Sequence, residues 1–170
     1  MKRAIELAKK GIGYTNPNPI VGCVVVKNDK IIAEGYHKKI GGFHAERNAL
    51  TNCKEDTTGA ELYVTLEPCC HYGKTPPCTE IIIEKKIKKV YVGSMDPNKL
   101  VEGKGVKILK EHGIEVKCGI LKDECDKLNE VFFHYITNKT PYVVMKYAMT
   151  MDGKIATHTG QSQWITDEAA

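Results

Sequence analysis

The sequence contains little arginine, and this scarcity limits the partners that the protein is suited to recognise. Arg3 and Arg47 are its only arginines, so lysine carries nearly all of its positive side-chain charge. Proteins that read bases or clamp phosphates favour arginine, because its planar guanidinium group donates two parallel hydrogen bonds. Lysine can still hold a small phosphorylated ligand as a point charge. We therefore expect a small-molecule partner and no nucleic-acid partner.

The sequence also lacks long apolar runs and an apolar leader. Its longest apolar stretches, such as residues 20–26 and 142–145, are far shorter than the roughly 20 residues of a membrane-spanning helix. Near the amino terminus, Glu6, Lys9 and Lys10 interrupt what would be the apolar core of a signal peptide. We expect no membrane partner and a cytoplasmic location, where the seven cysteines would be reduced and free to bind a metal.

What is present fits a folded protein with alternating strands and helices. The 170 residues, 42% hydrophobic and 27% charged with a net charge of +4, are enough for one ordinary globular domain. Two β-rich runs flank Asn28-Asp29, which predicts a hairpin. The expected strands are 20–27, 30–36, 61–66, 89–93 and 114–118, and the expected helices are 2–10, 44–52, 79–86, 105–111 and 123–135. This order predicts an α/β fold, a layered sheet with helices on both faces.

A polar joint that ends in Pro141 divides the chain. We expect one domain over residues 1–139 and a fragment of a second over residues 140–170, with a β-rich run from Tyr142. About 30 residues are too few for an independently folding domain. We therefore expect the second part to be truncated.

The chemistry is concentrated in His44-Ala45-Glu46 and in a later segment that contains Cys69 and Cys78. A catalytic zinc ion has three nitrogen or sulfur ligands from the protein and keeps a fourth position for water, whose pKa the metal lowers. One histidine and two cysteines would supply such a set. Glu46 could carry protons for that water without binding the metal. His-x-Glu followed by Pro-Cys-x-x-Cys is the pattern of zinc-dependent nucleobase deaminases.

The spacing of the cysteines departs from that pattern. Residues 70–77 separate them, and the glycine and prolines of this segment predict a loop. Cys78 would then begin the next helix, where the macrodipole favours an anionic sulfur. A structural zinc site with Cys70 or His71 as fourth ligand is the alternative. Because adjacent side chains point in different directions, Cys69 and Cys70 are not expected to bind one metal together.

Three motifs together make the chain similar to the bacterial bifunctional riboflavin-biosynthesis (RibD) family. They are NPNPIVG at residues 16–22, GFHAE at 42–46 and EPCCHYGKTPPC at 67–78. Residues 1–139 resemble the deaminase domain of that family. The resemblance implies a three-layer cytidine-deaminase-like fold with a central mixed sheet, and one Zn²⁺ held by His44, Cys69 and Cys78.

The resemblance also implies the reaction. The substrate would be 2,5-diamino-6-ribosylamino-4(3H)-pyrimidinone 5′-phosphate, deaminated to 5-amino-6-ribosylaminouracil 5′-phosphate with Glu46 as the catalytic residue. Substrate contacts would come from Asn18, His37, His71 and Lys74, in a homodimer or homotetramer. The alternatives are a deaminase of deoxycytidylate or of tRNA adenosine, and a non-catalytic zinc-stabilised binding module.

The last residues resemble the start of the reductase domain of the same family. The resemblance implies contacts of Ala148 and Trp164 with NADPH, and a contact of Ser162 with the substrate of the reductase. The 170 residues do not include the remainder of that domain. We therefore expect NADPH only in a full-length reductase domain, and no reductase activity from this chain.

Overall fold

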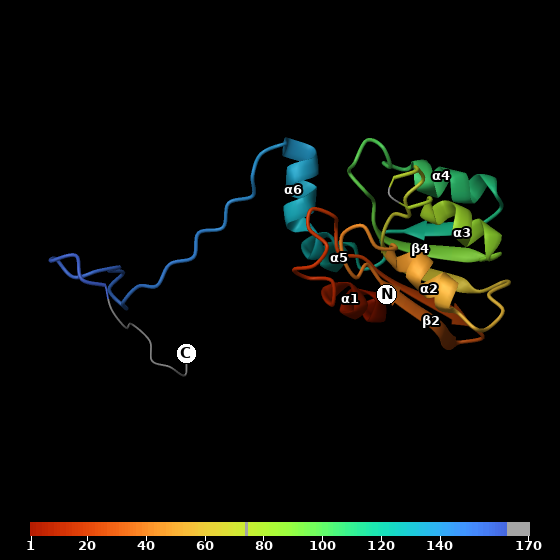
Figure 1. Ribbon diagram of the computed structural model, residues 1–170, viewed down its shortest axis with the longest axis horizontal. Helices are drawn as coiled ribbons and strands as arrows, with labels where there is room; N and C mark the ends of the chain where they lie inside the picture. Colours follow the sequence, from red (N-terminus) through yellow and green to blue (C-terminus); the bar gives the residue numbers. More distant parts are fainter. Residues whose placement is uncertain (74, 163–170) are drawn as a thin grey trace. The chain divides into compact units, whose positions relative to one another are not determined.

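The structure, a computed structural model, describes residues 1–73 and 75–162, and the chain separates into two units, Met1–Thr140 and Pro141–Ala170. All helices and strands that it describes lie in the first unit (Figure 1). In the second unit, the β-rich run from Tyr142 forms no strand within the described residues 141–162, and residues 142–145 are exposed.

Five strands form one mixed sheet. They are β1 (Gly22–Lys27), β2 (Lys30–Tyr36), β3 (Glu61–Leu66), β4 (Lys89–Ser94) and β5 (Glu115–Cys118). Their order is β2-β1-β3-β4-β5, with β1 antiparallel to β2 and β3, and with β3, β4 and β5 parallel. Asn28 and Asp29 have φ values of 51° and 59°, the left-handed values of a type I′ turn, which confirms the hairpin. The carboxyl ends of β3 and β4 meet at one end of the sheet.

Helices cover both faces of this sheet. On one face α1 (Lys2–Lys9) packs beside α5 (Lys122–Leu128), and the other face carries α2 (Ala45–Asn52), α3 (Cys78–Glu84) and α4 (Lys104–Glu111) (Figure 1). The larger core cluster lies between the sheet and these last three helices, and it includes the fully buried Leu50, Leu62, Ile82 and Leu109. The predicted α/β fold with helices on both faces is confirmed. No helix of the described residues has both the length and the apolar content to cross a membrane.

The single helix expected over residues 123–135 is two helices, α5 and α6 (Glu130–Asn138). Asn129 interrupts them with a φ of −123°. Its buried side chain bonds the backbone of Ile20, accepting from the N–H at 2.8 Å and donating to the C=O at 2.9 Å. The break therefore anchors the residue that follows the proline-rich loop at residues 16–19.

A close approach between α2 and β2 positions the first turn of α2. A Cβ added to Gly35 would lie 2.4 Å from the backbone oxygen of Ala45, so only glycine fits there. Because the helix packs directly on the strand, His44 and Glu46 lie at its amino terminus beside the end of the sheet.

Candidate metal centre and active site

Three side chains from separate segments meet at this end of the sheet. His44 immediately precedes α2, Cys69 follows β3, and Cys78 is the first residue of α3. Their ligand atoms all lie within 4.8 Å of one another. The Nδ1 atom of His44 is 3.4 Å from the sulfur of Cys69 and 3.6 Å from that of Cys78. The structure thus brings the three predicted ligands together.

The spacing of these atoms fits zinc. A tetrahedral ion with Zn–N of about 2.0–2.1 Å and Zn–S of about 2.3 Å separates its nitrogen and sulfur ligands by about 3.6 Å. Within residues 1–73 and 75–162, this His/Cys/Cys cluster has three members. Cys70 is outside it, because its thiol donates to the backbone oxygen of Leu100 at 3.8 Å. Three protein ligands leave a fourth tetrahedral position for a solvent or substrate atom.

The surroundings of the ligands favour an anionic sulfur. The backbone N–H of Cys78, at the amino terminus of α3, donates to the sulfur of Cys69 at 3.3 Å. Hydrogen bonds from the Cys78 thiol and from His44 lower the pKa of Cys69. The bond to Cys69 in turn raises the pKa of His44. The site therefore favours a thiolate at Cys69, whereas the hydrogen bond to Cys69 raises the pKa of the Cys78 thiol.

Glu46 lies beside the cluster without belonging to it. It occupies the first turn of α2 and is 3% exposed. Burial raises its pKa to about 7, because the charged form loses its hydration. A carboxyl group that titrates near neutral pH can both accept and return a proton. This property matches the role predicted for Glu46.

A cavity of about 440 Å³ opens onto the centre and is lined by His44, Glu46 and Cys69. Asn18 and His37 form part of its wall. The Nδ1–H group of His37 donates to the backbone oxygen of Phe43 at 3.0 Å, so its Nε2 accepts from Asn18 Nδ2 at 3.2 Å. Burial lowers the pKa of His37, which favours this neutral form. This bond uses the amide nitrogen of Asn18 and leaves its amide oxygen without a donor among the described residues.

The other residues predicted to contact a substrate or NADPH do not all lie at this cavity. His71 is exposed and lines the cavity, whereas Lys74 lies outside the described residues. Ala148 and Ser162 belong to the second unit and are exposed. Ser162 lines a separate hollow of about 280 Å³. Trp164 also lies outside the described residues.

Sequence reasoning missed several residues of the cavity wall. Asp96 and Asn98 line it from the loop after β4, Glu67 lines it from the end of β3, and Phe132 lines it from α6. Burial raises the pKa of Asp96 to about 6. Their position in the sequence could have marked some of these residues as candidates. Glu67 and the Asp-Pro-Asn run each follow an expected strand, and the two strands end at the same end of the sheet.

Comparisons with known proteins agree with this geometry. The family model of the cytidine and deoxycytidylate deaminase zinc-binding region matches residues 1–94, and the RibD C-terminal domain matches residues 141–170. Riboflavin biosynthesis protein RibD of Actinobacillus pleuropneumoniae is 66% identical over 170 residues, which cover 100% of this chain and 45% of that protein.

Solved structures show the same relationship. A diaminohydroxyphosphoribosylaminopyrimidine deaminase/5-amino-6-(5-phosphoribosylamino)uracil reductase from Thermotoga maritima is 59% identical, with a TM-score of 0.94, over 98% of this chain and 48% of that chain. The chain thus spans about half the length of these relatives. The dCMP deaminase of cyanophage S-TIM5 is 28% identical, with a TM-score of 0.53, over 69% of this chain and 91% of that chain.

These similarities confirm two of the predictions. The likeness to the Thermotoga and cyanophage structures confirms the cytidine-deaminase-like fold, and the match to RibD confirms the resemblance seen in the motifs. The matched zinc-binding region includes His44, Glu46, Cys69 and Cys78. The chain belongs to the family that carries the cytidine and deoxycytidylate deaminase zinc-binding region.

Proposed function

We propose that this chain hydrolytically deaminates 2,5-diamino-6-ribosylamino-4(3H)-pyrimidinone 5′-phosphate, giving 5-amino-6-ribosylaminouracil 5′-phosphate and ammonia. The observation that carries the proposal is a buried carboxyl group, Glu46, in one cavity with His44 and Cys69, two of the three candidate metal ligands. A purely structural zinc site has no use for such a group. The deaminase and reductase named for the Thermotoga structure supports the choice of substrate.

His44 Nδ1 and the sulfurs of Cys69 and Cys78 would hold the zinc ion. When bound, zinc supplies a water molecule whose pKa is lowered toward neutrality. The helix amino termini at Ala45 and Cys78 place partial positive charge beside the two sulfurs. These residues thus fix where the attacking oxygen meets the substrate.

Glu46 would move the protons of the reaction. Its carboxylate takes a proton from water as the C–O bond forms at C2, and gives that proton to the adjacent ring nitrogen. It then carries the second proton of the water to the departing amine, so that the C–N bond breaks and ammonia leaves. The pKa of about 7 suits both the acceptance and the return of a proton.

The cavity wall would select the pyrimidine. The amide oxygen of Asn18 can accept from a ring N–H or an exocyclic amine, and neutral His37 keeps that amide oriented. His71 and Lys74 would meet the 5′-phosphate, since an imidazole and an ammonium group suit an anion. A volume of about 440 Å³ is in the range of small-molecule sites.

The same proposal divides the chain into two domains. They are a deaminase domain over residues 1–139 and a reductase fragment over residues 140–170. The match of residues 141–170 to the RibD C-terminal domain supports it. Ala148 and Trp164 would contact NADPH, and Ser162 the reductase substrate, in a full-length reductase domain. A homodimer or homotetramer and a cytoplasmic location stay predictions.

Ammonia release from three candidate substrates tests the choice of reaction. The zinc-loaded chain would receive the diamino-pyrimidinone phosphate, deoxycytidylate, or an adenosine-containing tRNA stem-loop at equal concentration. We expect turnover of the first substrate alone. Turnover of only one of the other two would contradict the proposal, and no turnover by protein with one zinc per chain would favour a non-catalytic module.

A further inference from the structure

A buried carboxylate that the proposed reaction does not use lies beside the metal centre. Glu67 follows the last residue of β3 and is 4% exposed. Its Oε2 accepts from the backbone N–H of Gly103 at 3.0 Å and of Asp96 at 3.4 Å, and its Oε1 accepts from that of Val106 at 3.2 Å. We propose that Glu67 is a positioning residue that holds the loop of residues 95–103 against the cavity.

The three donors explain why an anion occupies this position. They come from the start of the loop, from its end, and from the first turn of α4. A carboxylate only accepts hydrogen bonds, whereas the NH₂ group of a glutamine would face at least one of these N–H groups. The negative charge of Glu67 also lies at the amino terminus of α4, where the macrodipole favours it. Glu67 therefore satisfies donors that helix geometry leaves unpaired.

Glycine at one position of α4 brings that helix directly onto the segment beside the metal. A Cβ added to Gly105 would lie 2.1 Å from the backbone oxygen of Pro68 and 3.3 Å from Glu67 Oε1. The backbone N–H of Glu67 also donates to the oxygen of Ser94 at 2.9 Å, which extends the pairing of β3 with β4. The segment that leads to Cys69 and the start of α4 are therefore fixed together.

The loop held in this way carries two polar residues of the cavity wall, Asp96 and Asn98. Asp96 Oδ1 accepts from the N–H of Asn98 at 2.8 Å, and the backbone oxygen of Asn98 accepts from Val101 at 2.7 Å and from Glu102 at 2.9 Å. These bonds brace the loop internally, so it responds as a unit when its ends are released. Glu67 joins both ends, and so sets where these two side chains meet a ligand.

Amide hydrogen exchange tests the positioning directly and needs no substrate. The full zinc-loaded chain would be compared as Glu67→Gln and as Glu61→Gln. The second is a matched change at the opposite end of β3, where the carboxylate accepts a hydrogen bond from the Tyr63 hydroxyl. We expect exchange at Asp96, Gly103 and Val106 to accelerate roughly tenfold or more in Glu67→Gln alone. Unchanged exchange at these amides would overturn the proposal.

Steady-state kinetics provides the second readout, which rests on the proposed deamination. Glu67→Gln should keep one zinc per chain and raise KM roughly tenfold, with a smaller change in kcat. Adding Asn98→Ala should raise KM little further, because both changes act on one loop. Fully additive effects, or a fall in melting temperature with KM unaltered, would overturn the positioning role.

Amide exchange reports on Glu67 independently of ammonia release. If the unsubstituted chain released no ammonia, the proposed function would fail while the exchange experiment still decided the role of Glu67. If Glu67→Gln did not fold, Glu67→Asp would replace it, since aspartate keeps the charge but shortens the reach. A smaller acceleration of exchange at the same three amides is then expected. Unaccelerated exchange at these amides would contradict the proposal.

Discussion

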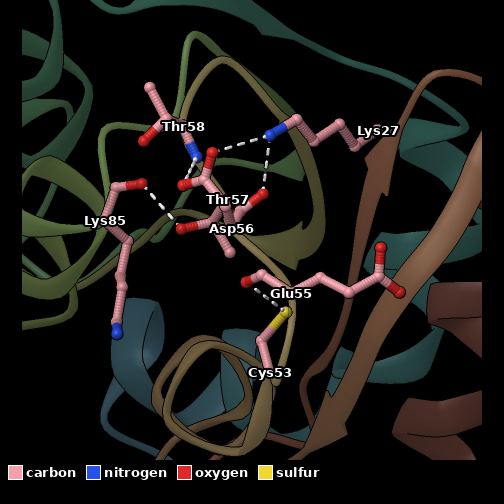
Figure 2. Close-up of polar contacts among 7 residues, drawn as sticks. All are labelled: Lys27, Cys53, Glu55, Asp56, Thr57, Thr58 and Lys85. Atoms are coloured by element: carbon pink, nitrogen blue, oxygen red, sulfur yellow. Dashed lines mark hydrogen bonds and ion pairs between the residues drawn. The ribbon is translucent and has the colours of Figure 1, made fainter.

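Glu46 and Asp96 at one end of the sheet contrast with Asp56 at the other end. At the carboxyl end of β3, Glu46 and Asp96 are buried, and burial raises their pKa values to about 7 and about 6. At the amino end, Asp56 lies in the exposed loop that joins α2 to β3 (Figure 2). Its carboxylate accepts from the N–H of Thr58 at 3.0 Å and pairs with Lys27 at 3.0 Å. These bonds, that from Thr58 foremost, lower the pKa of Asp56 to about 2.

The proposed catalytic groups and the bonds that stabilise this loop thus lie at different ends of the sheet. The loop in Figure 2 is tied by bonds to neighbouring backbone, such as the one from the Thr57 hydroxyl to the oxygen of Lys85 at 2.8 Å. There a carboxylate stays ionised and acts as a fixed acceptor. For Glu46 and Asp96, burial removes hydration from the charged form, so each holds its proton more tightly and can exchange it near neutral pH.

Loss of a metal ligand is expected to have the largest effect, and to affect only the end of the sheet that carries the metal cluster. Cys78→Ser should lose zinc and all measurable ammonia release, because two protein ligands hold the ion poorly. Cys70→Ser is the matched control and should keep both, since its thiol points to Leu100. Zinc content by elemental analysis, with activity, checks the pair. The reverse pattern would make Cys70 the third ligand.

Removing the proton carrier should be next in size. Glu46→Gln keeps the shape of the side chain but cannot accept a proton, so turnover should fall by roughly 10²–10⁴-fold. Zinc content should stay at one per chain, because Glu46 lies outside the ligand cluster. Single-turnover ammonia release measures the loss. A variant that retains full activity would show that Glu46 has no catalytic part.

The same substitution at the two ends should change stability with opposite signs. Asp96 has a folded pKa of about 6, above its unfolded value, so its own contribution to stability falls as pH rises from about 4 to 6. Asp96→Asn cannot ionise and should be more stable by about 1–3 kcal/mol at pH 8, with the gain vanishing near pH 4. Urea unfolding at both pH values measures this. Lower stability at pH 8 would mean that the burial cost is already compensated.

The smallest effect is expected at the exposed end. The folded pKa of Asp56 lies below its unfolded value, so its stabilising contribution is present above about pH 4 and is lost as pH falls toward 2. Asp56→Asn should lower stability slightly at pH 7 and flatten the acid limb of the pH profile. Urea unfolding between pH 2 and 7 tests it. Ammonia release should not change. A large loss of activity would show that the exposed end of the sheet also takes part in the reaction.

The fold followed from local signals, and its exceptions followed from distant contacts. Alternating strand and helix patterns predicted the five strands and the helices of the first unit, because periodicity is a property of neighbouring residues. The break at Asn129 depends on Ile20, far away in the sequence, so no local pattern contained it. The β-rich run from Tyr142 forms no strand within the described residues 141–162, because the composition of one segment does not by itself build a sheet.

The site divides in the same way. The motifs placed His44, Cys69 and Cys78 near one metal, and residue chemistry suggested the role of Glu46. Glu67 and Asp96 were missed, because their part depends on how the loop after β4 folds back onto the end of β3. Residue type and position after a strand could mark them as candidates, but only the folded chain shows the three N–H groups that meet Glu67.

X-ray absorption at the zinc edge tests the coordination on which the proposed chemistry depends. The zinc-loaded chain should show two sulfur ligands at about 2.3 Å and two lighter ligands at about 2.0–2.1 Å, of which only one is an imidazole. The second light ligand would then be solvent, the position that hydrolysis requires. A third sulfur from Cys70, or a second imidazole from His71, would close that position and contradict a catalytic zinc.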